Sequence, residues 1–170
     1  HGAGVSVPAE IQSHTISVLV ANEPGILARV VGLFSGRGYN IDTLNVAPTQ
    51  DPSSSRLTMV VPGDDRILEQ VTKQLNKLVD VIKVIDLTSE KYLDRELCLA
   101  KVQATPKNRS AIIELATLFH AEIICVQSKS LTLQMTGSAE EVDSFLELLK
   151  PHGLLDLTRS GVIAVTKSAE

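Results

Sequence analysis

Residues 15–38 read TISVLVANEPGILARVVGLFSGRG, and this stretch decides the fold. Its first part, residues 15–21, is rich in β-branched side chains and predicts a strand. Pro24 and Gly25 break that strand. Apolar residues then recur at helical spacing until the Gly-Arg-Gly segment at 36–38 ends the helix. The stretch therefore predicts a strand, a turn and a helix.

Further elements complete the first half of the chain. Residues 40–47 and 56–61 predict two strands, joined by a long turn that holds two prolines and three serines. Asp64 is the expected N-cap of a second helix, and residues 81–87 predict a fourth strand. The resulting order, βαββαβ, is the ferredoxin-like plan, in which an antiparallel sheet carries two helices on one face.

The second half shows the same order of elements without repeating the same sequence. The expected elements are strands at 96–104, 122–127, 130–136 and 154–166, a helix at 107–120, and a helix after the capping box from Ser138 to Glu141. Gly161 interrupts the last strand, where we expect a bulge or a bend. The expected fold class is therefore α+β, with two tandem ferredoxin-like domains whose antiparallel sheets have helices on one face.

The domain boundaries follow from these elements. We expect a flexible N-terminal arm at 1–13, a first domain at 14–88, a linker at 89–95 and a second domain at 96–170. The strands at 15–21 and 81–87 carry apolar residues on both faces, whereas helices cover only one face. We therefore expect the uncovered face to meet another sheet or subunit, which makes the chain a homodimer or a higher oligomer.

Composition limits the classes of partner. The 170 residues carry a net charge of −4, whereas nucleic-acid binding needs clustered Lys and Arg, so we expect no nucleic-acid partner. No apolar run approaches the roughly 18 residues that span a bilayer, so we expect no membrane partner. Cys98 and Cys125 lack metal-binding or CxxC spacing, which favours structural thiols in a reducing compartment, on strands that could be neighbours.

Residues for catalysis are not evident. A hydrolase or transferase would need a nucleophile with a base, paired carboxylates, or convergent metal ligands. The scattered histidines are interpreted as surface or cap residues: His1, His14, His120 and His152. RNA-recognition modules share the βαββαβ order, but the strands at 15–21 and 56–61 have no aromatic residue on which bases could stack. The sequence therefore predicts neither a catalytic residue nor a metal site.

The first turn offers a binding site for a small molecule. Gly25 has no side chain, so a ligand can approach the backbone N–H groups that the start of a helix leaves unpaired, and these donors suit a carboxylate. Asn22 and Asn40 carry amide oxygens that can accept hydrogen bonds from an ammonium group. An apolar side pocket could be lined by Ile26, Leu27 and Ile41. These groups together describe a free aliphatic amino acid, and the alternative is that the segment only starts a helix and ends a turn.

The same residues resemble a known family. The motifs NEPG at 22–25, RGYNI at 37–41, KLVDV at 77–81 and RSG at 159–161 follow one another at specific separations. They are similar to the ACT domain of the acetolactate synthase small-subunit type. The resemblance covers nearly the whole chain after the N-terminal arm.

The resemblance implies a regulatory subunit without catalysis of its own. In this family the subunit activates the thiamine-diphosphate-dependent catalytic subunit of acetolactate synthase. Two ACT domains join into an eight-stranded sheet, and valine, leucine or isoleucine bound at their interface gives feedback inhibition of branched-chain amino acid biosynthesis. The positions that match the effector contacts and pocket walls are Asn22, Gly25, Ile26, Leu27, Asn40 and Ile41. Asn40 would come from the neighbouring protomer.

The resemblance also implies that this chain binds no cofactor, since thiamine diphosphate, Mg and FAD belong to the catalytic subunit. One copy of the ACT-plus-C-terminal unit is similar to the bacterial type, which implies a cytoplasmic location, or a plastid or mitochondrion if the source is eukaryotic. The alternative function is a free-standing ACT-type amino-acid sensor that regulates transcription or another enzyme. Such a sensor would not activate acetolactate synthase.

Overall fold

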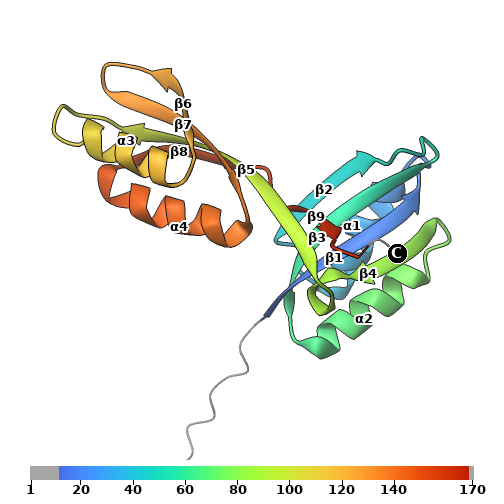
Figure 1. Cartoon of the computed structure of the whole chain (residues 1–170). Coiled ribbons are helices and arrows are strands. Elements are labelled where there is room, and N and C mark those ends of the chain that lie inside the picture. Colours follow the sequence, from blue (N-terminus) through green and yellow to red (C-terminus); the bar gives the residue numbers. More distant parts are fainter. Residues whose placement is uncertain (1–11, 169–170) are drawn as a thin grey trace, which may run out of the picture. The chain divides into compact units, whose positions relative to one another are not determined.

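The computed structural model describes residues 12–168, and the chain divides between Tyr92 and Leu93 into an N-terminal and a C-terminal unit. Each unit is an antiparallel sheet with two helices packed on one face (Figure 1). The predicted fold class, two ferredoxin-like βαββαβ units, is confirmed. Within the described residues, no helix has both the length and the apolar character needed to span a membrane.

The N-terminal sheet has the strand order β2-β3-β1-β4, which places the first strand in its interior and β2 and β4 at its edges. The elements of this unit are β1 (Gln12–Ala21), α1 (Ile26–Arg37), β2 (Thr43–Pro48), β3 (Ser54–Gly63), α2 (Asp65–Asn76), β4 (Val81–Asp86) and the 3₁₀ helix η1 (Leu87–Ser89).

The core of this unit forms because side chains alternate along each strand. Ile16, Val18 and Val20 of β1 lie on one face of the sheet and are fully buried. Their partners in the core come from β3, α1 and α2: Leu57, Met59, Val61, Ile26, Val30, Phe34, Val71 and Leu75. The predicted N-cap of α2 is confirmed, because the Asp64 carboxylate accepts a hydrogen bond from the Ile67 N–H at 3.0 Å.

The C-terminal sheet has the order β6-β7-β5-β8, and β9 also pairs with β5. Its elements are β5 (Tyr92–Gln103), α3 (Arg109–Leu118), β6 (Glu122–Val126), β7 (Ser130–Gly137), α4 (Ala139–Leu149), the 3₁₀ helix η2 (Lys150–His152), β8 (Leu154–Arg159) and β9 (Ile163–Thr166). One half of the predicted capping box is present, because the Ser138 hydroxyl accepts a hydrogen bond from the Glu141 N–H at 3.1 Å. The core of this unit lies between β5, β7, α3 and α4.

Several element boundaries differ from the sequence-based expectation; residues 40–42, for example, were expected in a strand but precede β2. Gln12 and Ser13, placed in the arm, belong to β1, where they pair with Gly63 and Pro62; residues 1–11 lie outside the described part. Residues 92–95, which we expected in the linker, form the start of β5. Their polar sequence does not indicate a strand, and β5 pairs with β9, a segment far away in the sequence. Gly161 does not bend one strand but separates β8 from β9, with a left-handed φ of 77°.

Two interpretations of single side chains also need correction. His14 is 3 % exposed and its Nε2 lies 3.2 Å from the Gly63 carbonyl oxygen, because β1 starts early enough to turn His14 towards the helices. It is therefore not a surface or cap residue. Cys98 and Cys125 are not on neighbouring strands, since β7 lies between β5 and β6. Cys98 is buried as a structural thiol would be, whereas Cys125 is exposed.

Candidate functional site at the start of helix α1

The candidate site lies at one end of the N-terminal sheet. Val20 of β1 and Pro48 of β2 both stand opposite Ser55 of β3, so the C-terminal ends of β1 and β2 lie at the same end of the sheet. The β1–α1 loop (residues 22–25) and the β2–β3 turn (residues 49–53) both leave the sheet there. Two segments that are far apart in the sequence therefore meet at this end.

Two sets of contacts hold the β1–α1 loop. On one side the Ala21 N–H donates to the Asp80 carbonyl oxygen at 2.8 Å, and the Asp80 carboxylate pairs with Arg29 of α1. On the other side the Asn22 N–H donates to the Ser53 carbonyl oxygen at 2.8 Å. The loop backbone is thus fixed from two directions, and the Arg29 charge is already paired with an acid.

The Asn22 side chain is also held. Its Nδ2 donates to the Pro52 carbonyl oxygen at 3.3 Å, and within the described chain its Oδ1 accepts no hydrogen bond. Because the amide nitrogen and oxygen lie on opposite sides of the amide carbon, a contact at Nδ2 turns Oδ1 away from the turn. The structure therefore leaves an exposed, oriented acceptor next to the start of α1.

The first turn of α1 has no acidic residue, and no side chain caps the helix. Gly25 is the N-cap, with a left-handed φ of 82°. In the described residues the N–H groups of Leu27 and Ala28 donate to no acceptor. By contrast, the N-terminus of α2 is capped by Asp64. Free donors and the positive end of the helix dipole make the start of α1 suited to a carboxylate.

Gly25 leaves open space above these donors. A Cβ placed on Gly25 would meet no atom within 4 Å, so the glycine is required by its backbone angle and not by a neighbouring side chain. The two predicted wall residues next to it differ. Ile26 is 8 % exposed and belongs to the core, whereas Leu27 is 42 % exposed and faces outward.

The other predicted site residues lie at the opposite end of α1. Asn40 is exposed, and Ile41 is half-buried against the core, shortly after Gly38 ends the helix. A helix of twelve residues is about 18 Å long. One chain therefore does not bring Asn40 and Ile41 to Asn22 and Gly25.

The sequence did not reveal the main-chain carbonyl groups that accept hydrogen bonds from Ala21 and from the β1–α1 loop. Pro52, Ser53 and Asp80 are separated from the loop by many residues, so local patterning gives no sign of them. One signal was present for the turn, since an aspartate before a Pro-Ser pair is typical of an Asx turn. Asp80 lies within the KLVDV motif at 77–81, which was used only as a mark of family resemblance.

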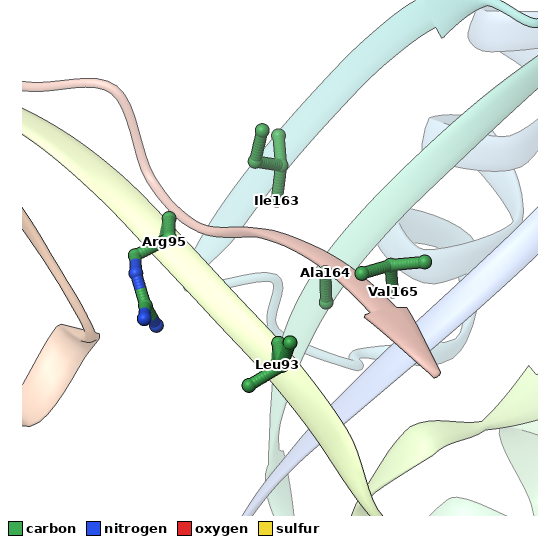
Figure 2. Close-up of a pocket in the computed structure, with 5 residues that line it drawn as sticks. All are labelled: Leu93, Arg95, Ile163, Ala164 and Val165. Carbon is green, nitrogen blue, oxygen red and sulfur yellow. The ribbon is translucent and has the colours of Figure 1, made fainter. Parts of the chain in front are cut away.

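The C-terminal unit has a group of charged side chains around Arg159 and, separately, an apolar hollow. Arg159 of β8 pairs with the buried Glu96 of β5 and with Asp143 of α4, and the hydrogen bonds that Arg159 donates to the Glu96 carboxylate are the main cause of its raised pKa. This unit also has a hollow of about 300 Å³, and Figure 2 shows the residues that line it. Its lining residues are Leu93, Arg95, Ile163, Ala164 and Val165. Among the described residues, no group of three His, Cys, Asp or Glu side chains is arranged to hold a metal ion.

Comparison with known proteins covers both units. Residues 16–83 match the model of the "AHAS small subunit-like ACT domain", and residues 95–168 match that of the "Small subunit of acetolactate synthase". The acetolactate synthase small subunit of Haemophilus influenzae is 48 % identical over 153 residues, which cover 89 % of this chain and 94 % of that protein. The chain belongs to the acetolactate synthase small-subunit family.

Other members of the family agree with this assignment. The acetolactate synthase small subunit of Mycolicibacterium smegmatis is 45 % identical over 155 residues, which cover 91 % of each chain. A crystal structure of the acetolactate synthase small subunit from Thermotoga maritima has a TM-score of 0.82 and 34 % identity, and the match covers 94 % of this chain and all of that one. The family resemblance read from the motifs is confirmed.

Proposed function

We propose that the chain is the regulatory subunit of acetolactate synthase in branched-chain amino acid biosynthesis. It activates the thiamine-diphosphate-dependent catalytic subunit, and it makes that subunit sensitive to valine, leucine or isoleucine. Membership of the small-subunit family supports the first part. The second part is supported by one observation, the uncapped start of α1 beside an oriented amide oxygen.

The effector site takes its two halves from two copies of the chain. β2 is an edge strand, paired only with β3 within the described residues, so it is open to strand pairing with a second copy. In an antiparallel β2–β2 pair, the N-terminal end of one β2 lies beside the C-terminal end of the other. Asn40 and Ile41, which precede β2, then reach the end of the sheet where Asn22 and Gly25 of the first copy lie.

Each part of an aliphatic amino acid has a partner in this arrangement. The free N–H groups after Gly25 bind the carboxylate, and the amide oxygens of Asn22 and of Asn40 from the second copy accept from the ammonium group. Leu27 and the second copy's Ile41 contact the aliphatic side chain, while Ile26 supports the loop from within the core. The guanidinium group of Arg29 pairs with the Asp80 carboxylate, so we assign the main-chain N–H groups, and not Arg29, to the carboxylate of the ligand.

Regulation then follows from linkage between two binding equilibria. The dimer binds the catalytic subunit and stabilises its productive conformation, whereas the effector favours an arrangement of the dimer that does so less well. An effector can shift this equilibrium only by the difference between its affinities for the two arrangements. A site built across two copies provides such a difference, because the distance between its halves changes with the arrangement of the dimer.

The test is reconstitution with a catalytic subunit from the same source. Pyruvate condensation is measured with and without the chain, and then with valine, leucine and isoleucine in turn. We expect stimulation by the chain, inhibition by at least one amino acid, and loss of that inhibition in Asn22→Ala. Asn76→Ala, which changes an exposed asparagine at the end of α2, is the matched control and should keep the inhibition. No change in rate on mixing would refute the proposed function.

A further inference from the structure

The β2–β3 turn is ordered by its own hydrogen bonds. The Asp51 Oδ1 accepts from the Ser53 N–H at 2.9 Å and from the Ser53 hydroxyl at 2.7 Å. These two bonds to Ser53 lower the pKa of the Asp51 carboxyl, so the side chain stays an ionised acceptor. The Thr49 hydroxyl in turn donates to the Asp51 carbonyl oxygen at 3.0 Å. Main-chain bonds from the Thr49 N–H to the Ser54 carbonyl oxygen and from the Ser54 N–H to the Asp51 carbonyl oxygen add to these contacts. The exposed turn is therefore fixed by hydrogen bonds and not by burial.

Two successive carbonyl groups of this turn hold one residue of the candidate site. The Ser53 carbonyl oxygen accepts from the Asn22 N–H, and the Pro52 carbonyl oxygen accepts from Asn22 Nδ2. The two residues whose carbonyl groups hold Asn22 lie directly after Asp51. The bond from the Ser53 N–H to Asp51 orients the peptide group that also carries the Pro52 carbonyl, the acceptor of Asn22 Nδ2. The Ser53 carbonyl belongs to the next peptide group, whose Ser54 N–H donates to the Asp51 main-chain carbonyl oxygen at 3.1 Å.

We propose that Asp51 is a positioning residue for effector binding, acting through the β2–β3 turn on the Asn22 side chain. The inference rests on the proposed function, because it requires Asn22 to bind the amino acid. Asp51 itself touches no ligand. Its carboxylate keeps Asn22 Nδ2 on the Pro52 carbonyl group and thereby keeps Asn22 Oδ1 on the side of the ligand.

Loss of the Asp51 carboxylate changes the orientation of the Asn22 side chain. Without the bonds to Ser53, main-chain hydrogen bonds such as that from the Ser54 N–H to the Asp51 carbonyl oxygen still hold the turn. The peptide group between Pro52 and Ser53 loses its side-chain acceptor, however, and the Asn22 amide can then rotate. In the rotated state Nδ2, a donor, faces the ammonium group, which is also a donor, so this state does not bind the ligand. Immobilising one side chain on binding lowers affinity by about two- to tenfold, and Asp51→Ala should weaken effector binding by that factor.

The chain offers a matched control for this substitution. Asp86, at the end of β4, makes the same kind of bond, because its Oδ1 accepts from the Thr88 N–H at 3.1 Å. It stands opposite Ile16, away from the end of β1 at which Asn22 lies. Asp86→Ala removes one turn-stabilising bond of this kind, where Asp51→Ala removes two, and leaves the surroundings of Asn22 unchanged.

The experiment compares Asp51→Ala, Asp51→Asn and Asp86→Ala in the full-length chain. Valine, leucine and isoleucine are titrated by calorimetry, and each is then titrated as an inhibitor of the reconstituted holoenzyme. We expect about two- to tenfold weaker binding for Asp51→Ala. Asp51→Asn should recover most of the affinity, since its amide oxygen can still accept both bonds from Ser53. Asp86→Ala should bind as the unchanged chain does.

The stimulated rate without amino acid should be the same for all three variants, and circular dichroism verifies that each is folded. Equal affinity for Asp51→Ala and the unchanged chain overturns the inference, and so does an equal loss in Asp51→Ala and Asp86→Ala. If the unchanged chain responds to an effector and only Asn22→Ala loses that response, the proposed function stands and the role of Asp51 is refuted. If the unchanged chain binds none of the three amino acids, both fail.

Discussion

The ion pair between Glu96 and Arg159 allows a quantitative prediction about stability. The Glu96 side chain is 3 % exposed, and its two carboxylate oxygens accept hydrogen bonds from the Arg159 guanidinium group at 2.7 and 2.8 Å. Glu96→Gln replaces one of these acceptors with an NH₂ group, which then faces a second donor. A hydrogen bond to a charged group contributes about 1.5–3 kcal/mol, and leaving a buried donor without an acceptor adds to the loss.

Two features reduce this loss. The Arg159 side chain is 32 % exposed, so water can solvate it, and it keeps its hydrogen bond to Asp143 at 2.7 Å. We therefore expect Glu96→Gln to lower the free energy of unfolding of the C-terminal unit by about 2 kcal/mol. For a domain of this size the loss corresponds to a Tm about 10 °C lower.

Urea denaturation and thermal unfolding followed by circular dichroism measure this change. Glu147→Gln is the control, because Glu147 pairs with Lys150 on the surface, where its side chain is 69 % exposed. An exposed pair of this kind contributes less than about 1 kcal/mol. Equal unfolding midpoints for Glu96→Gln and Glu147→Gln would show that burial does not govern the strength of the Glu96 pair, and the reasoning would be refuted.

Two further predictions concern Gly25 and the cysteines. Gly25→Ala should lower the free energy of unfolding by about 1 kcal/mol, because a φ of 82° is unfavourable for alanine. It should also weaken effector binding measured by calorimetry. Gly32→Ala is the control, because Gly32 lies in the middle of α1 with open space around it, and this change should not destabilise the chain. Maleimide should label only the exposed Cys125 in the native chain, since burial raises the pKa of the Cys98 thiol. Mass spectrometry counts the labels. Two labels on the native chain, or one label on the native Cys125→Ser variant, would contradict this prediction.

Much of the fold could be predicted because its signals are local. The N-caps Asp64 and Ser138 were identified from a few neighbouring residues, and in each case the side chain accepts the expected backbone hydrogen bond. The order of helices and strands followed from periodicity in the same way. Strand β9 could not be separated from β8 on these grounds, because its pairing with β5 joins segments far apart in the sequence.

The candidate site shows the same limit. Gly25 could be identified from the sequence because a strand ends and a helix begins there, and the structure places it at the uncapped start of α1. The residues that hold Asn22 could not be identified, since Pro52 and Ser53 reach it only through the pairing of β1 with β3. That Ile26 packs into the core while Leu27 faces outward depends on the rotation of α1 about its axis.

The length of α1 has a genetic consequence under the proposed dimer. Because Asn22 and Asn40 lie at opposite ends of this helix, each effector site of the dimer combines Asn22 from one chain with Asn40 from the other. A heterodimer of one Asn22→Ala chain and one Asn40→Ala chain has both defects in the same site and leaves the second site complete. Two alleles that each abolish feedback inhibition should therefore complement one another when they are expressed together.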